Sequence, residues 1–334
     1  MSRTTKEPNA ASLLRDLYAP IETELEQVEQ VLRDELRSEH AYVDELVRYG
    51  CLLGGKRLRP ALLLLSGKAV GKLTQDHIVL AAVVEMIHTA TLVHDDVLDE
   101  ADTRRHLATV NSRWDNKASI LLGDYLFTHA FYLASTRNST WACREIGLAT
   151  NIVCEGELRQ KGSRGDYQLG ETEYLDIIAS KTAELCACSC RLGSHYSGAT
   201  PDVVERFTRF GRDLGIAFQI ADDVLDLLGE EKTVGKSLGT DLEQQKPTLP
   251  LIRLLELASA SERQEVLSIL NRDGRESIGE LMPLLRRHGA IEYALATAQR
   301  YASSAAAAIE FDEYDCTILR TLRQVTDFVV NRPM

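Results

Sequence analysis

Residues 75–101 read QDHIVLAAVVEMIHTATLVHDDVLDEA, an apolar run that ends in closely spaced carboxylates. The run contains no proline, so it predicts one uninterrupted helix. Positions i, i+1 and i+4 of a helix lie within an arc of about 100°. Asp95, Asp96 and Asp99 are therefore expected to project from one face of this helix, next to apolar residues.

The same acidic motif returns at Asp222, Asp223 and Asp226, in a second helical segment at about residues 201–228. Clustered carboxylates repel one another, and their burial without compensation is costly. Mg²⁺ relieves that cost because it binds carboxylate and phosphate oxygens together. One such motif is typical of a solvated acidic face, whereas two identical copies that follow apolar sequence favour a metal site.

Helical patterns extend over most of the chain. No proline lies between Pro60 and Pro201, strand-like alternation is scarce, and the helix-favouring residues Leu, Ala, Glu and Arg are abundant. We predict an all-α fold, with residues 1–10 as a disordered N-terminal segment and residues 11–334 as one domain. The expected helices lie at about residues 11–36, 40–50, 59–69, 75–101, 107–114, 117–136, 141–162, 171–197, 201–228, 247–258, 261–272, 275–288, 290–307 and 315–330.

The composition narrows the class of protein. With 38 basic and 50 acidic residues the net charge is −12, which predicts a soluble chain and disfavours binding to nucleic acid. Seven cysteines in a chain of this size favour a reducing, cytoplasmic location. The N-terminus lacks the apolar run of a signal peptide, and we expect no membrane span, although peripheral membrane association stays open.

Three of the cysteines, Cys186, Cys188 and Cys190, are spaced by two residues, which is not the spacing of a zinc site. On a helix Cys188 is expected to point away from the other two. We interpret them as small apolar side chains of a helix.

Basic residues gather in short segments of this acidic chain. Three cations follow a glycine pair in residues 54–60, GGKRLRP, where a helix is expected to begin. Glycine lets a backbone approach a ligand closely, and a helix N-terminus favours an anion. The other segments are Arg104-Arg105, Lys181-Thr182, Lys236 and Lys246. Together they predict a local positive cluster for an anionic substrate.

These motifs, in this order, resemble the trans-isoprenyl diphosphate synthases over roughly residues 12–330. The resemblance rests on Gly54 to Pro60, Glu85-x-x-His88, His94 to Asp99, Arg104-Arg105, Gly123-Asp124, Lys181-Thr182, Phe218 to Asp226, Gly235-Lys236, Gly239-x-Asp241 and Lys246 to Pro250. The phrases IHTATL at 87–92 and EGE at 155–157 are similar to bacterial long-chain members such as octaprenyl diphosphate synthases. The resemblance implies a helical bundle of the isoprenoid synthase type around a central cavity, and a homodimer.

The resemblance also implies residue roles. About three Mg²⁺ ions would be held by two groups of carboxylates: Asp95 and Asp99, and Asp222 with Asp223 and Asp226. The allylic diphosphate would be bound by Arg104, Lys181, Thr182, Gln219, Lys236 and Lys246. Isopentenyl diphosphate, which takes no metal, would be bound by Lys56, Arg59, His88 and Arg105. The expected catalytic set is Asp95, Asp96, Asp99, Lys181, Thr182, Gln219 and Asp222.

The implied reaction is ionisation, condensation and elimination. Lys181, Thr182 and Gln219 are also expected to present dipoles to the allylic cation, and the released diphosphate is the implied proton acceptor. Two positions depart from the family pattern. His106 follows Arg105, and Gln245 precedes Lys246, where glycine is usual.

Product length is expected to depend on the residues below the first acidic motif. Thr91 lies one helical turn, about 6 Å, from Asp95, and Ala90 is its neighbour. Both side chains are small, where short-chain members often carry aromatic residues as a floor. We predict a product longer than farnesyl, such as an octaprenyl precursor of a quinone side chain. A deeper floor from Phe127, Phe131 or Tyr132, and hence a farnesyl or geranylgeranyl product, stays open.

Three other classes of protein compete with this hypothesis. Glu85-x-x-His88 has the spacing of half a di-iron carboxylate site, but no other histidine has a glutamate three residues before it. A class I terpene cyclase would not need the second diphosphate site formed by Lys56, Arg59 and His88. A non-catalytic subunit of a heteromeric synthase is disfavoured because both acidic motifs are complete.

Overall fold

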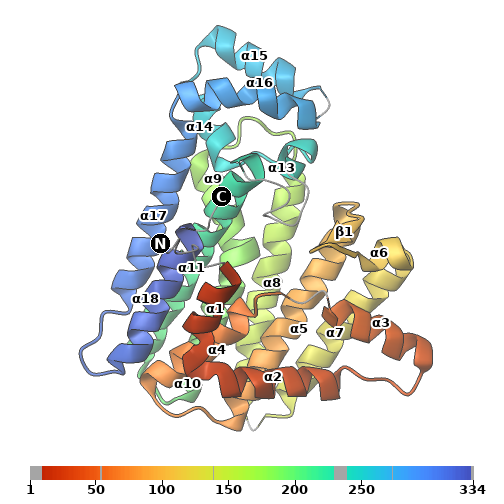
Figure 1. The fold of residues 1–334 in the computed structure, drawn as a ribbon, viewed down its shortest axis with the longest axis vertical. Helices are drawn as coiled ribbons and strands as arrows, with labels where there is room; N and C mark the ends of the chain where they lie inside the picture. Colours follow the sequence, from red (N-terminus) through yellow and green to blue (C-terminus); the bar gives the residue numbers. More distant parts are fainter. Residues whose placement is uncertain (1–9, 53–54, 138, 229–238, 273, 332–334) are drawn as a thin grey trace, which may run out of the picture.

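The computed structural model describes residues 10–52, 55–137, 139–228, 239–272 and 274–331. The fold is all-α, as predicted. Its long helices run side by side as a bundle, and a pair of helices, α15 and α16, caps one end (Figure 1). The helices are α1 (Ala10–Tyr18), α2 (Glu22–Glu35), α3 (Ala41–Leu52), α4 (Leu58–Val70), α5 (Gln75–Leu98), α6 (Val110–Arg113), α7 (Asn116–Ser135), α8 (Thr140–Gly162), α9 (Glu171–Ile178), α10 (Glu184–Tyr196), α11 (Pro201–Leu228), α13 (Thr240–Glu243), α14 (Leu249–Leu257), α15 (Ala260–Leu270), α16 (Gly274–Arg287), α17 (Ala290–Ala308) and α18 (Cys316–Val330).

Besides the short helix α13, which lies in no predicted helix, the described residues depart from the predicted helices in three places. A 3₁₀ turn at Ala19–Ile21, which contains Pro20, separates α1 from α2, because proline lacks the N–H of a continuous helix. Residues 107–108 are not helical, since strands β1 (Thr103–Arg104) and β2 (Leu107–Ala108) pair as a small hairpin. A π-helical turn at Ala179–Ala183 connects α9 to α10 inside the predicted helix 171–197.

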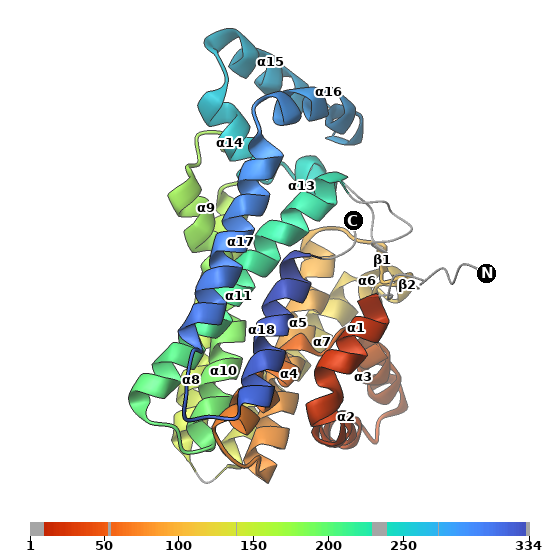
Figure 2. The same cartoon turned by 60° about the vertical axis from the view of Figure 1, so that its left-hand side comes forward.

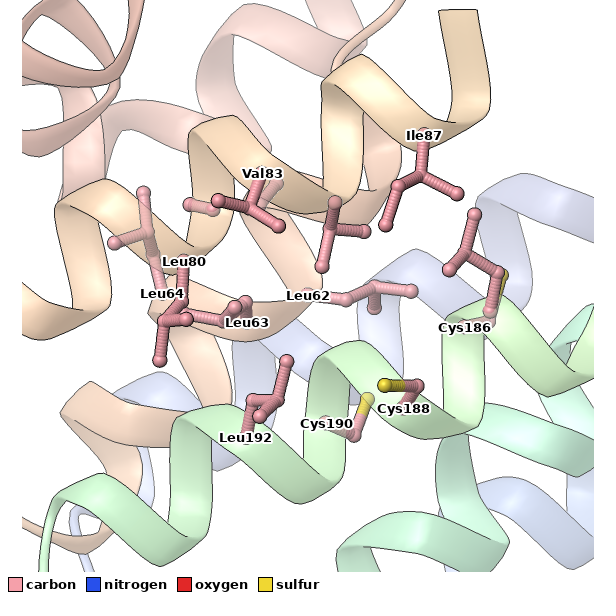
Figure 3. Close-up of a cluster of buried hydrophobic side chains, with 14 of the residues drawn as sticks. Leu62, Leu63, Leu64, Leu80, Val83, Ile87, Cys186, Cys188, Cys190 and Leu192 are labelled. Carbon is pink, nitrogen blue, oxygen red and sulfur yellow. The ribbon is translucent and has the colours of Figure 1, made fainter. Parts of the chain in front are cut away.

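Helix α5 lies at the centre of the larger hydrophobic core. It packs against α4, α7 and α10. Figure 3 shows side chains of α4, α5 and α10, such as Leu63, Val83 and Cys190, gathered in one cluster. Helix α5 is long and apolar enough to cross a membrane by length and composition, but 78% of its apolar window is buried inside the fold. It is therefore the core helix of this bundle.

The three closely spaced cysteines of α10 belong to the same core. All three are buried and free, and Cys188 lies against α8, where its sulfur is 4.0 Å from the carbonyl oxygen of Glu145. Burial raises the pKa of Cys188 and Cys190, which makes these thiols unreactive. Their interpretation as small apolar core residues is confirmed.

A second hydrophobic core lies between α9, α14, α15, α16 and the adjoining parts of α11 and α17. Helix α11 contributes to both cores, with Leu214 in the first and Ile220 in the second. Helices α1 and α18, from opposite ends of the chain, lie side by side (Figure 2). The organisation of residues 11–334 as one domain stays a prediction.

Candidate active site

A cavity of ≈ 1570 Å³ lies between the C-terminal halves of α5 and α11, where the two acidic motifs are. Ala90 and Asp226 do not line it, and Lys236 lies outside the described residues. The remaining predicted site residues all line this cavity: Lys56, Arg59, His88, Thr91, Asp95, Asp96, Asp99, Arg104, Arg105, Lys181, Thr182, Gln219, Asp222, Asp223 and Lys246.

Asp95 lies near the ammonium of Lys181, a residue of the π-helical turn. The ammonium of Lys181 lies 3.7 Å from Asp95 Oδ2 and 2.5 Å from Glu157 Oε2, and it donates to Gln160 Oε1 at 2.8 Å. Burial, together with the charges of Glu157 and Asp99, raises the pKa of Asp95 to about 6. Burial opposes a charged Lys181, but its surrounding carboxylates outweigh that effect and raise its pKa. Asp95 and Glu157 therefore share the charge of Lys181.

The other carboxylates of the first motif also contact cations. Asp99 Oδ1 accepts from Arg164 at 2.8 Å, and its Oδ2 lies 3.6 Å from the ammonium of Lys246. Asp96 is buried, and its Oδ1 accepts from Arg104 at 2.8 Å. Two of the expected diphosphate-binding cations, Lys181 and Lys246, thus lie near carboxylates that are expected to hold metal.

The second motif divides into three different environments. Asp222 is half-buried and lines the cavity. Asp223 is buried between Tyr174 and Gln219, and burial with the nearby charge of Asp241 raises its pKa to about 8. Asp226 is fully buried and accepts from the hydroxyl of Thr240 and the backbone N–H of Asp241. Asp226 was predicted to bind metal. In the structure its carboxylate instead accepts hydrogen bonds from the first residues of α13.

Close helix packing shapes the π-helical turn that carries Lys181 and Thr182. A Cβ at Gly156 of α8 would lie 2.5 Å from the backbone nitrogen of Lys181, and one at Gly215 of α11 would lie 2.5 Å from Cα of Ala183. Two glycines therefore let α8 and α11 approach the turn from opposite sides. π-turns inside α-helices frequently occur at functional sites.

A separate basic region lies beside the N-terminus of α4. Arg59 and His88 line the cavity there, and burial with the charge of Arg59 and its neighbouring arginines keeps the pKa of His88 well below its usual value. His88 is therefore neutral. Arg57 instead forms ion pairs with Glu29 and with Glu85, the latter at 2.7 Å. Because Glu85 is engaged by Arg57, it is not placed as half of a di-iron site.

The cavity becomes apolar beyond the first acidic motif. Thr91, Phe127 and Val153 line this part. Ala90 is fully buried in the larger core instead. Ala90 therefore does not line the cavity, contrary to the expectation that it borders a growing chain. Thr91 and Phe127, the predicted alternative floor, do line the cavity.

Several residues of the site were not assigned from the sequence. Glu157 appeared only within the EGE phrase, and Asp241 only within a family motif. No local signal indicated Gln160 on α8, Arg164 in the loop after α8, or Tyr174 on α9. Each of them contacts a residue far away along the chain.

The donor set fits Mg²⁺ that is shared with a diphosphate. Within the described residues no three His, Cys, Asp or Glu side chains form a ready-made metal site. Asp95, Asp99 and Asp222 nevertheless line one cavity from two helices, and buried Asp96 Oδ2 has no hydrogen-bond partner among the described atoms. Mg²⁺ is usually bound through one or two carboxylates together with waters and phosphate oxygens.

The two departures from the family pattern share one backbone feature. His106 has φ of 64° and Gln245 has φ of 53°, both in the left-handed region that favours glycine. The carbonyl oxygen of Gln245 accepts from the N–H of Gly165 at 2.8 Å. The glycine conformation is thus kept at both positions although the residue has changed.

Comparisons with known proteins agree with this geometry. Residues 40–285 match the protein family described as "Polyprenyl synthetase". The octaprenyl diphosphate synthase of Escherichia coli is 34% identical over 85% of this chain and 88% of its own. The short chain isoprenyl diphosphate synthase of Methanothermobacter thermautotrophicus is 36% identical over 84% and 87%. A crystal structure of polyprenyl synthase from Caulobacter crescentus, complexed with calcium and isoprenyl diphosphate, superposes with a TM-score of 0.89 at 32% identity, covering 96% and 98%.

Proposed function

Because this chain belongs to the polyprenyl synthetase family, we propose that it is an all-trans polyprenyl diphosphate synthase that extends an allylic diphosphate with isopentenyl diphosphate. The family's enzymes are magnesium-dependent prenyltransferases, and this chain is one of them. The observation that carries the specific proposal is the division of one cavity into an acidic side and a basic side. Two diphosphates, one with metal and one without, match this division.

On the acidic side Asp95, Asp99 and Asp222 would hold the metal. Mg²⁺, when bound, neutralises charge on the departing diphosphate. Lys181, whose ammonium lies 3.7 Å from Asp95 Oδ2, and Lys246, whose ammonium lies 3.6 Å from Asp99 Oδ2, would be placed to bind diphosphate oxygens beside such a metal. The positive charge is therefore already inside the cavity before substrate arrives.

On the basic side Arg59 and neutral His88 would bind isopentenyl diphosphate, with Lys56 and Arg105 at the rim. The allylic C–O bond would break with its electron pair on the departing diphosphate, the double bond of isopentenyl diphosphate would form the new C–C bond, and the released diphosphate would take the proton that the condensed product loses. Orientation of the two substrates across one cavity supplies much of the rate, because it makes the encounter unimolecular.

We propose a product longer than farnesyl. The relatives named above include an octaprenyl and a short-chain enzyme, so the proposal rests on the cavity wall. Its wall includes Thr91 and Val153, each one helical turn before a residue that contacts Lys181, Asp95 on α5 and Glu157 on α8. Phe127 is the aromatic residue that borders this path, and a shorter geranylgeranyl product is the alternative if it forms a floor.

We further propose a cytoplasmic homodimer. Large apolar side chains are exposed on the neighbouring helices α7 and α8, among them Leu121 (65%), Tyr132 (64%) and Leu158 (72%). Exposed apolar side chains on two neighbouring helices favour a protein partner. Leu158 also lines the cavity, so a second copy seated there would close the cavity's side.

The proposed function is tested by incubating the purified protein with farnesyl diphosphate, isopentenyl diphosphate and Mg²⁺. We expect chain extension that stops when Mg²⁺ is chelated. Release of diphosphate without extension would identify a terpene cyclase, and no turnover would indicate a non-catalytic subunit. Either result would contradict the proposal.

A further inference from the structure

Two cations from segments far apart in the chain meet at one carboxylate of the cavity. Asp99 caps the C-terminus of α5, where its N–H donates to the carbonyl oxygen of Asp95 at 2.8 Å. Its Oδ1 accepts from Nη2 of Arg164 at 2.8 Å, and its Oδ2 lies 3.6 Å from the ammonium of Lys246. Arg164 follows α8, Lys246 follows α13, and both line the cavity together with Asp99. Arg164 is therefore a cation of the acidic side to which the sequence motifs gave no role.

A backbone contact between two turns holds these cations beside each other. Gly165, the residue after Arg164, has φ of 75°, and its N–H donates to the carbonyl oxygen of Gln245 at 2.8 Å. Gln245, the residue before Lys246, has φ of 53°. The N–H of Lys246 donates in turn to the carbonyl oxygen of Asp241 at 2.8 Å. Each cation is thus one residue away from the hydrogen bond that joins the two turns.

The guanidinium of Arg164 has more donors than its contact with Asp99 uses. It carries five N–H groups in a planar fork, and Nη2 makes that contact. Its Nε is buried and has no hydrogen-bond partner among the described atoms. An arginine fork matches the oxygens of a phosphate, to which it can donate two parallel hydrogen bonds. Arg164 can therefore contact Asp99 and an anion at the same time.

We propose that Arg164 is a further diphosphate-binding residue, which acts with Lys246 on the diphosphate that a metal at Asp99 would hold. The proposal rests on the proposed function and deepens it, because it adds a guanidinium to the acidic side of the cavity. A diphosphate brings several negative charges to a place that Asp95, Asp99 and Asp222 already line. Cations beside the metal lower the cost of that charge.

A purely structural ion pair is the competing interpretation, because Arg164 also ties the turn after α8 to the end of α5. The side chain of Arg164 is 28% exposed and that of Asp99 is 25% exposed. An ion pair that solvent reaches contributes little to stability. The structural interpretation therefore predicts a small change in unfolding and no change in the affinity for an anion.

The chain offers a matched control three residues earlier. Lys161 is exposed in the last turn of α8 and does not line the cavity. Arg164→Gln and Lys161→Gln each remove one positive charge from this end of α8. The first also removes the donor fork from the cavity, and the second does not.

The test measures the binding of inorganic diphosphate by calorimetry at saturating Mg²⁺, in wild type and in both variants. For Arg164→Gln we expect Kd to rise about tenfold, which is the scale of one hydrogen bond between charged groups. Lys161→Gln should keep the wild-type Kd, because an exposed charge outside the cavity is screened by salt. Isopentenyl diphosphate without metal should bind Arg164→Gln as it binds wild type, which also shows that this variant is folded.

Steady-state kinetics supply a second readout, since the two substrates are proposed to lie on different sides of the cavity. In Arg164→Gln the KM for farnesyl diphosphate should rise about tenfold, and the KM for isopentenyl diphosphate should stay unchanged. Lys161→Gln should keep both wild-type values.

Three results would overturn the proposal while wild type still extends chains. One is a wild-type Kd for inorganic diphosphate in folded Arg164→Gln. Another is an equal rise of Kd in Lys161→Gln, which would reduce the effect to net charge. The third is a rise confined to low Mg²⁺ concentrations, which would mean that Arg164 acts through Asp99 and its metal. Absence of extension by wild type would instead contradict the proposed function itself.

Discussion

At Asp95 the requirement for a metal ligand opposes the stability of the metal-free protein. Burial raises its pKa to about 6, from 3.8 for a free side chain. The folded protein therefore binds more protons than the unfolded chain between these values. The stabilisation is present below pH 4 and is lost as the pH rises through 6.

We therefore predict that Asp95→Asn stabilises the metal-free protein at pH 7 by about 1–3 kcal/mol. The gain should be smaller at pH 5, where wild-type Asp95 is mostly protonated. Activity should fall at least a hundredfold, because a metal ligand is lost. Urea unfolding in a chelator at both pH values measures the first effect. A less stable Asn variant at pH 7 would show that the ion pair with Lys181 outweighs burial.

The left-handed residues give a second prediction at this scale. His106→Gly and Gln245→Gly should each raise the free energy of unfolding by about 0.5–1 kcal/mol, since a left-handed conformation costs a non-glycine residue more than glycine loses in entropy. Gln244→Gly is the control, because Gln244 has φ of −84° and should lose stability. Denaturant titration compares the three. Destabilisation by all three substitutions would show that the left-handed conformation of His106 and Gln245 does not strain the folded protein.

At the scale of elements, sequence reasoning found the helices because each carries its own pattern. It missed the π-helical turn, which depends on contact with α8 and α11 at Gly156 and Gly215, far away along the chain. It also missed the β1–β2 hairpin, whose strands are two residues long. The acidic motifs could be recognised because clustered carboxylates beside apolar sequence are unusual. Glu157, which contacts Lys181, and Tyr174, which contacts Asp223, resemble ordinary helix residues in the sequence.

Helix α8 offers a direct test of how the π-helical turn is held. In Gly156→Ala the new Cβ would lie 2.5 Å from the backbone nitrogen of Lys181, so α8 or the turn must move. We expect a loss of about 1–3 kcal/mol in stability and about a hundredfold in kcat. Gly162→Ala on the same helix meets nothing within 4 Å and should leave both unchanged. Equal behaviour of the two variants in unfolding and rate measurements would contradict this account.

For the whole molecule, the apolar face of α7 and α8 predicts the oligomeric state. Because the two helices are joined by a short connection, Leu121 lies toward the same end as Leu158. Leu121→Lys and Leu158→Lys should each weaken a homodimer at least tenfold. Leu257→Lys, at an exposed apolar residue of α14, should not. Sedimentation velocity distinguishes these outcomes, and a monomeric wild type would refute the predicted interface.

We propose that one cavity joins two diphosphate substrates and lets an apolar chain grow past the first acidic motif. Mass spectrometry of products made from farnesyl diphosphate and isopentenyl diphosphate tests it most directly, in wild type and in Phe127→Ala. We predict a magnesium-dependent series of products longer than farnesyl, whose limit moves to longer chains when Phe127 is removed from the cavity wall. Wild-type products no longer than farnesyl, or the same limit in both proteins, would contradict it.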